Sequence, residues 1–403
     1  MRCIGLALFA IACGGGHARS DAPAAGDGTR GDGARAIDAT AGDAGSSDGC
    51  PADSHLAVDR TACGSAIVAP PDALLTATPQ PGDVVSLDGL DEGALPCAPM
   101  LVCSPDAASQ MMFSDDPETV ATDGVLYADT VGPGHVRVYV YHVNAGAAAR
   151  KFPVVVLDQG SADAHVTITK LGIAGPSTDY VDVGKAVAAS WMASTLARAV
   201  TVPAGTRVLL DAGLDGNHAQ TDELVHAIVD LDVDAPVKIS VVSVLATEDA
   251  AAVTAGLPLL ANDGKHDRGT FAQPEVWLAG AAGDAAPSAR HLRLGGDVTE
   301  ADLTGTDATT GAPATLTSNY GVAYRVLVTA PGALRLAASA RGGDWVGGEL
   351  AGSAAFGLPT ASGALSTTTD AVWLATLGSG TSDVTVMSGG GGSLPVDVVV
   401  VTP

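Results

Sequence analysis

Residues 136–185 read VRVYVYHVNAGAAARKFPVVVLDQGSADAHVTITKLGIAGPSTDYVDVGK, and this stretch decides the fold class. Residues 135–144 alternate with a period of two, as expected for a half-buried strand that projects successive side chains to opposite faces. Residues 154–157 are all apolar and predict a strand covered on both faces. Residues 166–170 predict a third strand, rich in β-branched side chains. Because only short turns separate these runs, the sequence predicts an antiparallel meander.

A glycine- and proline-rich turn and a helix are expected after the third strand. Residues 172–176 (GIAGP) contain strand-breaking residues, so we expect the strand to end there. Asp182 is a good N-cap for a helix from about Val183 to Leu196. The buried stripe of this helix is predicted to be Val183, Val187 and Trp191, which have helical spacing.

The N-terminus has the features of an export signal, predicted over residues 1–12. Arg2 is followed by a short apolar run, and Ala10-Ile11-Ala12 precedes Cys13. Small residues before a cysteine resemble a bacterial lipobox, in which Cys13 would be lipidated, although Ala-Ile-Ala also fits cleavage of a secreted protein. Two or more acyl chains hold a protein firmly on a bilayer. Because Gly14 rather than aspartate follows, the resemblance to bacterial lipoproteins implies outer-membrane sorting, facing either the periplasm or the cell surface.

A low-complexity tether and a cysteine-rich lead-in are predicted next. Residues 13–49 have almost no large apolar side chains after the cysteine, so we expect a disordered tether. Residues 50–105 predict a loop-rich lead-in stapled by disulfides, because an even number of cysteines is typical of exported chains. Short loops favour two pairs among the three possible connectivities. These pairs are Cys50–Cys63 and Cys97–Cys103.

The rest of the chain predicts two antiparallel β-sandwich domains of the immunoglobulin-like type. Residues 106–247 form the first, with one helix, and residues 265–403 the second. Residues 248–264 are expected to connect them.

Composition excludes several classes of protein. The formal net charge of −25 argues against nucleic-acid binding and against electrostatic docking on anionic lipid, so membrane attachment would come from acyl chains. Aromatic residues are 4% of the chain, which is unfavourable for a membrane barrel and sparse for a glycan-stacking surface. Trp345 is the one candidate for an exposed ring, whereas the other tryptophans are expected in the core. These are Trp191, Trp277 and Trp373.

Motifs that carry chemistry are weak. The sequence contains no GxSxG, HExxH or phosphate-loop motif, so it names no catalytic residue and no cofactor. Residues 211–222 (DAGLDGNHAQTD) partly match a calcium loop but lack an oxygen ligand at the third position and have aspartate at the twelfth. The candidate ligands are Asp211, Asp215, Asn217 and Asp222. A solvated acidic turn is the competing interpretation. Residues 265–271 (KHDRGTF) are interpreted as a structural polar network.

Several phrases together resemble a known family. They are LYADTVGPGHVRVYVYHVN, the segment from Gly172 to Lys185, HDRGTF at residues 266–271 and LTGTDATTGAPATLTSNYGVAYRV. They are similar to a β-rich region of secreted bacterial proteins, often found before stalk repeats named after the copper amine oxidase N-terminal domain. The resemblance covers residues from about Asp115 to the end and implies a cell-envelope role without naming a reaction. A copper amine oxidase is excluded because Asn319-Tyr320 is followed by Gly321 and the copper-binding histidine pattern is missing.

The sequence therefore predicts a lipid-anchored cell-envelope protein with a non-enzymatic role, binding an unidentified protein or glycan or serving as structure. One alternative is an exported hydrolase with a site between the two domains. Another is a calcium-dependent surface adhesin, and a secreted protein without an anchor is the alternative for localisation.

Overall fold

Four β-sheets make up the structure. A computed structural model describes residues 64, 68–91, 95–98, 100–104, 106, 108–281, 287–295 and 302–403. The prediction of a mainly β chain built from two sandwiches is confirmed, and the described residues belong to one compact unit. The expected signal peptide, Cys13 and the tether lie outside the described residues.

The first sandwich consists of two sheets. Sheet 1 has the order β11-β8-β13-β5, with β7 beside β13; these are Arg207–Leu209, Val154–Asp158, Val237–Leu245, Gly124–Val131 and Arg150–Lys151. Sheet 2 has the order β10-β9-β12-β6-β3-β14-β17-β18, with β4 beside β6. Its strands are Arg198–Val202, Ala164–Ser177, Leu224–Val233, Gly134–Asn144, Gln110–Ser114, Arg268–Ala272, Leu303–Asp307, Ala312–Leu316 and Thr119–Val120. Valine side chains from both sheets fill the space between them.

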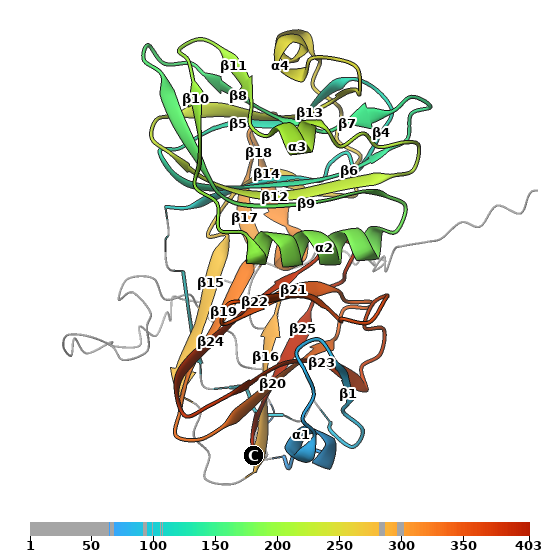
Figure 1. Ribbon diagram of the computed structural model, residues 1–403, viewed down its shortest axis with the longest axis vertical. Coiled ribbons are helices and arrows are strands. Elements are labelled where there is room, and N and C mark those ends of the chain that lie inside the picture. Colours follow the sequence, from blue (N-terminus) through green and yellow to red (C-terminus); the bar gives the residue numbers. More distant parts are fainter. Residues whose placement is uncertain are drawn as a thin grey trace, which may run out of the picture. The chain divides into compact units, whose positions relative to one another are not determined.

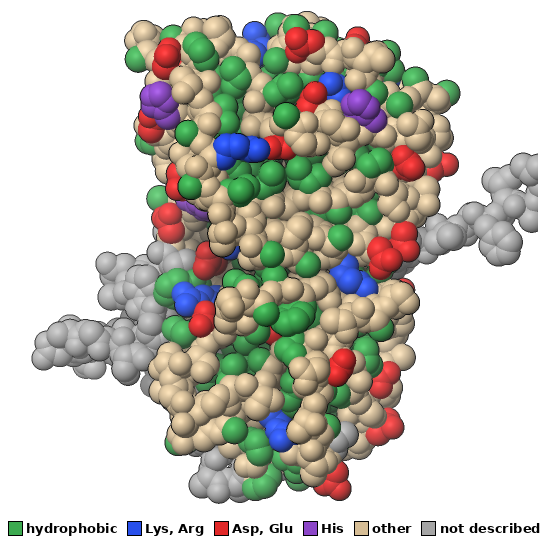
Figure 2. All heavy atoms as spheres, in the orientation of Figure 1, with side chains coloured by type: hydrophobic (Ala, Val, Ile, Leu, Met, Phe, Trp, Pro, Cys, Tyr) green, Lys and Arg blue, Asp and Glu red, His purple; other side chains and the backbone are tan. Residues whose placement is uncertain are grey.

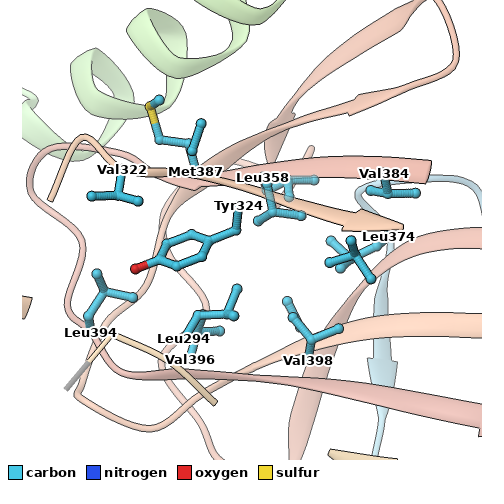
Figure 3. Close-up of a cluster of buried hydrophobic side chains, with 14 of the residues drawn as sticks. Leu294, Val322, Tyr324, Leu358, Leu374, Val384, Met387, Leu394, Val396 and Val398 are labelled. Carbon is cyan, nitrogen blue, oxygen red and sulfur yellow. The ribbon is translucent and has the colours of Figure 1, made fainter. Parts of the chain in front are cut away.

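The second sandwich also consists of two sheets. Sheet 3 has the order β2-β15-β19-β24-β21-β22, comprising Met100–Cys103, Glu275–Ala281, Ala323–Ala330, Gly380–Ser388, Gly347–Ala351 and Ala354–Leu358. Sheet 4 has the order β1-β23-β20-β25-β16, comprising Val84–Ser86, Asp370–Leu377, Leu334–Ala340, Val396–Thr402 and Ser288–Leu294. Figure 3 shows the core between them, with Tyr324 among Leu294, Val384, Val396 and Val398.

Helical segments are few and mostly short. They are α1 (Asp72–Thr76), α2 (Tyr180–Ala193), α3 (Ala212–Asp215), α4 (Ala250–Val253) and the 3-10 turns η2 (Thr254–Gly256) and η3 (Thr317–Asn319). None of the helices in the described part of the chain has the length and apolar character needed to span a bilayer.

The predicted meander is wrong. β6 and β8 lie in different sheets of the first sandwich, and β12 pairs with both β6 and β9. Three strand pairs are parallel, namely β3–β6, β4–β6 and β15–β19, so the sheets are not purely antiparallel. Strand β8 is nevertheless covered on both faces, as predicted: Val154 and Val156 face the sandwich core, while Val155 packs with residues of α4 and its neighbours.

The expected domain boundaries do not separate the sheets. β14, β17 and β18 come from the predicted second domain, yet they extend sheet 2 of the first sandwich through the pairing of β14 with β3. The predicted lead-in contributes β1 to sheet 4 and β2 to sheet 3. Because these strands hydrogen-bond across the expected boundaries, the two sandwiches share the chain rather than dividing it in sequence.

Glycine does not end β9, which continues to Ser177 beside the long strand β12. At Gly172 a Cβ atom would come within 2.8 Å of Trp191, so glycine there allows α2 to lie close to the strand. The helix begins at Tyr180, earlier than predicted, because Asp179 rather than Asp182 is the N-cap and accepts a hydrogen bond from the Asp182 backbone. Its predicted apolar stripe is buried, as expected.

Helix α2 connects the two sandwiches. It packs on β9 and β12 with one side and on β21 and β22 with the other, and Figure 1 shows it between the two pairs of sheets. The backbone of α2 lies very close to the backbone of the second sandwich. A Cβ atom on Gly184 would lie 1.6 Å from the Gly390 carbonyl oxygen, and one on Gly348 would lie 2.7 Å from Ala188. Small residues therefore set the spacing between helix and second sandwich.

We expect Gly184→Ala to lower the free energy of unfolding by about 1–3 kcal/mol, because the new methyl group overpacks a backbone contact. This loss should exceed the gain of roughly 1 kcal/mol that alanine brings within a helix. Urea denaturation measures the difference. Gly256→Ala is the control, since a Cβ atom there would meet nothing within 4 Å. A variant Gly184→Ala as stable as the natural chain would contradict the close packing of α2.

Candidate ligand groove

The candidate calcium loop is a capped turn. Asp211 is the N-cap of α3, where its Oδ1 accepts from the Leu214 amide at 2.7 Å, and its other oxygen pairs with Arg198. Asp215 pairs with Lys151 at 2.8 Å. The other two candidates are Asn217, in the loop after α3, and Asp222, in the turn before β12. Within the described residues, no group of three His, Cys, Asp or Glu side chains could hold a metal ion.

The cysteine positions are only partly described. Cys97 and Cys103 are disulfide-bonded, and the Cys103 side chain is fully buried beside Ala279. Cys50 and Cys63 lie outside the described residues, so the pairing of the four cysteines stays a prediction.

The tryptophans differ in part from expectation. Trp345 is fully buried and donates through its ring nitrogen to the Ser388 hydroxyl at 2.9 Å, so the prediction of an exposed ring is wrong. Trp277, expected in the core, is half-buried with Arg325 over its ring at 5.0 Å. Both remaining tryptophans are buried, as predicted.

A serine–histidine pair lies inside the first sandwich. The Ser114 hydroxyl is 2.9 Å from His142 Nε2, and His142 Nδ1 is 2.9 Å from the Pro117 carbonyl oxygen. Since the carbonyl can only accept, Nδ1 carries the proton and Nε2 accepts from the serine. Both side chains are fully buried, and burial lowers the pKa of His142 to about 3. A hydrolase needs such a pair within reach of substrate, and this one is enclosed.

The segment around His266 forms the polar network that was predicted for residues 265–271. His266 lies between two carboxylates, with Asp263 at 2.7 Å and Glu118 at 3.2 Å. Burial alone would raise the pKa of Asp263, but hydrogen bonds from His266 and nearby amides lower it to about 2. Arg268 is buried and pairs with Asp307 at 3.1 Å. These contacts hold β14 beside β17 and the segment before β14 against sheet 2.

A groove with a volume of about 170 Å³ lies on the outer face of sheet 1. It is lined by Val125, Ala128, Val155, Leu157, Arg207, Lys238, Ser240, Thr254, Ala255 and Leu257. Figure 1 shows α4 over this sheet, on the side away from α2. The segment after α4 is fixed to β5, because the Val125 amide donates to Pro258 and the Leu260 amide donates to Val125. One wall of the groove is thus the turn η2 and the other is the open part of the sheet.

The strands of sheet 1 place two cations in one row across the groove. Arg207 on β11 and Lys238 on β13 are both opposite Leu157 on the central strand β8. Residues opposite one another in neighbouring strands project to the same face. Two residues further along β8, on the same face of the sheet, Val155 lies opposite both Leu209 and Ser240. Ser240 is buried. Charged and apolar side chains therefore lie side by side on this face.

Arg207 and Lys238 differ from most cations of this acidic chain. Many arginine and lysine side chains elsewhere in the described chain pair with carboxylates, as Arg150 does with Asp123 and Lys151 with Asp215, whereas Lys170 and Arg335 lie over tryptophan rings. Neither groove cation has a carboxylate within 4.0 Å in the part of the chain that the structure describes. Figure 2 shows how sparse lysine and arginine are on one face of the molecule.

Neither Arg207 nor Lys238 was predicted from the sequence as a functional residue. The available signal was a cation at an outward position of a strand in a chain with 20 cations and 45 acids. That signal does not show that β11 and β13, which carry the two cations, both pair with β8.

Comparisons with known proteins add little. No protein-family model matches the chain, and no curated protein matches it. Among solved structures it is similar to the PBSX exported protein XepA, with 12% identity and a TM-score of 0.15, over 70% of this chain and 86% of that chain. It is also similar to an oxalate decarboxylase of Lactobacillus farciminis in complex with formate, with 11% identity and a TM-score of 0.15, over 83% of this chain and 89% of that chain. Likeness this weak carries no argument about function.

Proposed function

We propose that this chain is a cell-envelope lipoprotein, anchored in the outer membrane through Cys13, with a non-enzymatic binding role. The observation that supports binding is the groove on sheet 1. Its lining combines apolar side chains with two cations that have no carboxylate partner among the described residues, and it includes no carboxylate or imidazole. Nucleophilic and acid–base catalysis need a base close to the reacting group, so this groove is better suited to holding a ligand than to transforming one.

The two alternatives have less support. An exported hydrolase would need the enclosed Ser114–His142 pair, or another pair, to open to solvent. A calcium-dependent adhesin would need Asp211 and Asp215 to exchange Arg198 and Lys151 for the ion. The export signal and the acyl anchor rest on the sequence of residues 1–13 and on the resemblance to bacterial lipoproteins.

Mass spectrometry of the mature N-terminus, prepared from native membranes, tests the anchoring. We expect a chain that begins at Cys13 and carries a diacylglyceryl group and a further acyl chain. Replacing Cys13 with serine should release the protein from the membrane fraction, and replacing Cys3, the other cysteine of the N-terminal segment, should not. A mature product that keeps Met1, or one that begins elsewhere without acyl groups, would contradict the proposal.

A further inference from the structure

We propose that the groove on sheet 1 binds a small organic anion, a monocarboxylate with a compact aryl or short alkyl body. This inference rests on the proposed binding function and specifies the ligand class of that site. The anionic group would lie between Arg207 and Lys238, and the apolar body would lie against Val155, Leu157 and Leu257.

The spacing of the strands supports a single anion between the two cations. Arg207 and Lys238 lie one strand to either side of Leu157, so their backbones are about two strand spacings, or roughly 10 Å, apart. An arginine and a lysine side chain can each cover half of that distance. A carboxylate has oxygens on two sides, and arginine can donate to one of them in a fixed geometry while lysine acts as a point charge.

The positive charges of Arg207 and Lys238 make an anion the complementary ligand for the groove. The two cations are half-buried next to apolar side chains, where solvent screens charge less than in bulk water. Like charges on one face repel each other, and no carboxylate of the described chain offsets this repulsion at the groove. A bound anion would remove the repulsion and gain two charge-assisted contacts. The negative charge of the whole protein would slow the approach of the anion but would not alter the local contacts.

The size of the groove limits the ligand. An engineered protein cavity of about 150 Å³ holds benzene, so the groove volume of about 170 Å³ fits a ring or a short alkyl chain. Sites for drug-sized ligands usually exceed about 300 Å³. A glycan chain or a folded partner would therefore extend outside the groove, whereas a benzoate-sized anion matches its volume.

Isothermal titration calorimetry of the full chain in a non-ionic detergent tests the proposal, with benzoate and hexanoate as probes. We expect saturable one-site binding of at least one of them, weakened as salt rises. Benzamide and hexanol are the matched neutral ligands, and their affinity should be lower by at least about tenfold. The double variant Arg207→Gln/Lys238→Gln should bind about a hundredfold more weakly, since it loses two charge-assisted contacts that are each worth about a factor of ten.

Lys265→Gln is the matched control variant, because Lys265 is an exposed lysine outside the groove. It should bind both anions as the natural chain does. Circular dichroism and the melting temperature without ligand show whether the double variant is folded, and a Leu257→Ala variant, which changes the apolar wall only, should weaken hexanoate with both cations intact.

Three results would overturn the inference. They are equal binding of benzoate and benzamide, unchanged benzoate binding by the folded double variant, and no heat of binding for either anion at millimolar concentration. The first would leave the groove as a binding site for neutral ligands and so would keep the proposed function. Failure of the envelope assignment itself would be seen separately, in the mass of the N-terminus.

Discussion

Replacing Glu349 with glutamine is expected to raise the free energy of unfolding at pH 8 by about 3–5 kcal/mol. Glu349 lies on β21 with 0% of its surface exposed, and neither of its carboxylate oxygens has a hydrogen-bond partner within the described structure. Burial raises the pKa of this carboxyl group to about 9. The folded protein therefore holds Glu349 in its neutral form at pH 8, whereas the unfolded chain would ionise it freely in water.

The sign of the pH dependence follows from the raised pKa. An ordinary glutamate pKa is near 4.5, so between about pH 4.5 and pH 9 the folded state binds a proton that the unfolded state has released. The contribution of this group is most favourable below pH 4.5 and is lost as pH rises to about 9, by about 1.4 kcal/mol per pH unit. Glutamine resembles the neutral acid in shape and polarity and does not titrate. The advantage of the variant should therefore be small at pH 5 and grow toward pH 8.

Urea denaturation of both proteins from pH 5 to pH 9 measures this difference. Other groups titrate in the same range, but they are present in both proteins and cancel in the comparison. Glu223→Gln is the control, because Glu223 lies at the surface and its carboxylate only accepts from the Gln220 amide. The stability gain at pH 8 should be much smaller for this control than for Glu349→Gln. An advantage of Glu349→Gln that does not change with pH would show that Glu349 is not held neutral in the folded protein.

Local patterning was enough to predict the strands but not their partners. The alternation in residues 135–144 predicted β6 correctly, but its half-buried character is wrong, because both faces of the strand are buried from Val136 to Asn144. The run from Val154 to Leu157 predicted a strand covered on both faces. Strands joined by short connections are neighbours in only about two-thirds of cases, and here β6 and β8 face each other across the core. Such long-range pairing depends on which apolar faces meet, and no single segment of the sequence determines this.

Side-chain roles were harder to predict than strands. Residues 211–222 have oxygen atoms at some calcium-binding positions, but the sequence could not show that Arg198 and Lys151 neutralise the carboxylates. At the groove the sequence likewise could not show that two cations lie close together without a carboxylate beside them in the described structure. Arg207 and Lys238 are separated in sequence and come together only because β11 and β13 both pair with β8. Which cation pairs with which carboxylate is decided by how the strands pair in the sheet, and the local sequence does not show this.

Replacing Arg137 with methionine is expected to lower the free energy of unfolding by about 3–5 kcal/mol, the usual cost of removing one partner of a buried ion pair. Arg137 is 1% exposed and pairs with both oxygens of Asp230, at 2.8 and 3.0 Å. It also donates to the carbonyl oxygens of Pro274 and Gly321, at 2.6 and 2.9 Å. Since these two residues lead into β15 and β19, Arg137 on sheet 2 also ties the second sandwich to the first.

The pH dependence of this variant should differ from that of the natural chain. Burial alone would raise the pKa of Asp230, but the charge of Arg137 and the hydrogen bonds from His135 and Arg137 hold it well below its usual value. The pair therefore contributes stability above about pH 4, and this contribution is lost as pH falls. Without Arg137 the buried carboxylate keeps only the contact with His135 at 3.6 Å and the charge of Lys170, so the deficit of the variant should be large at pH 7 and smaller at pH 4. Urea denaturation at both values measures it.

Arg325→Met is a closely matched control for Arg137→Met. Arg137 lies over the Trp191 ring at 4.4 Å, and Arg325 likewise lies over a tryptophan ring and pairs with an aspartate, Asp383, at 2.8 Å, but the Arg325 side chain is 34% exposed. An exposed pair is worth about 1 kcal/mol or less, so this variant should lose little. The double variant Arg137→Met/Asp230→Leu should lose less than Arg137→Met alone, because it leaves no unpaired buried carboxylate. Equal losses of stability in the two arginine variants would contradict the claim that burial of the Arg137–Asp230 pair determines its strength.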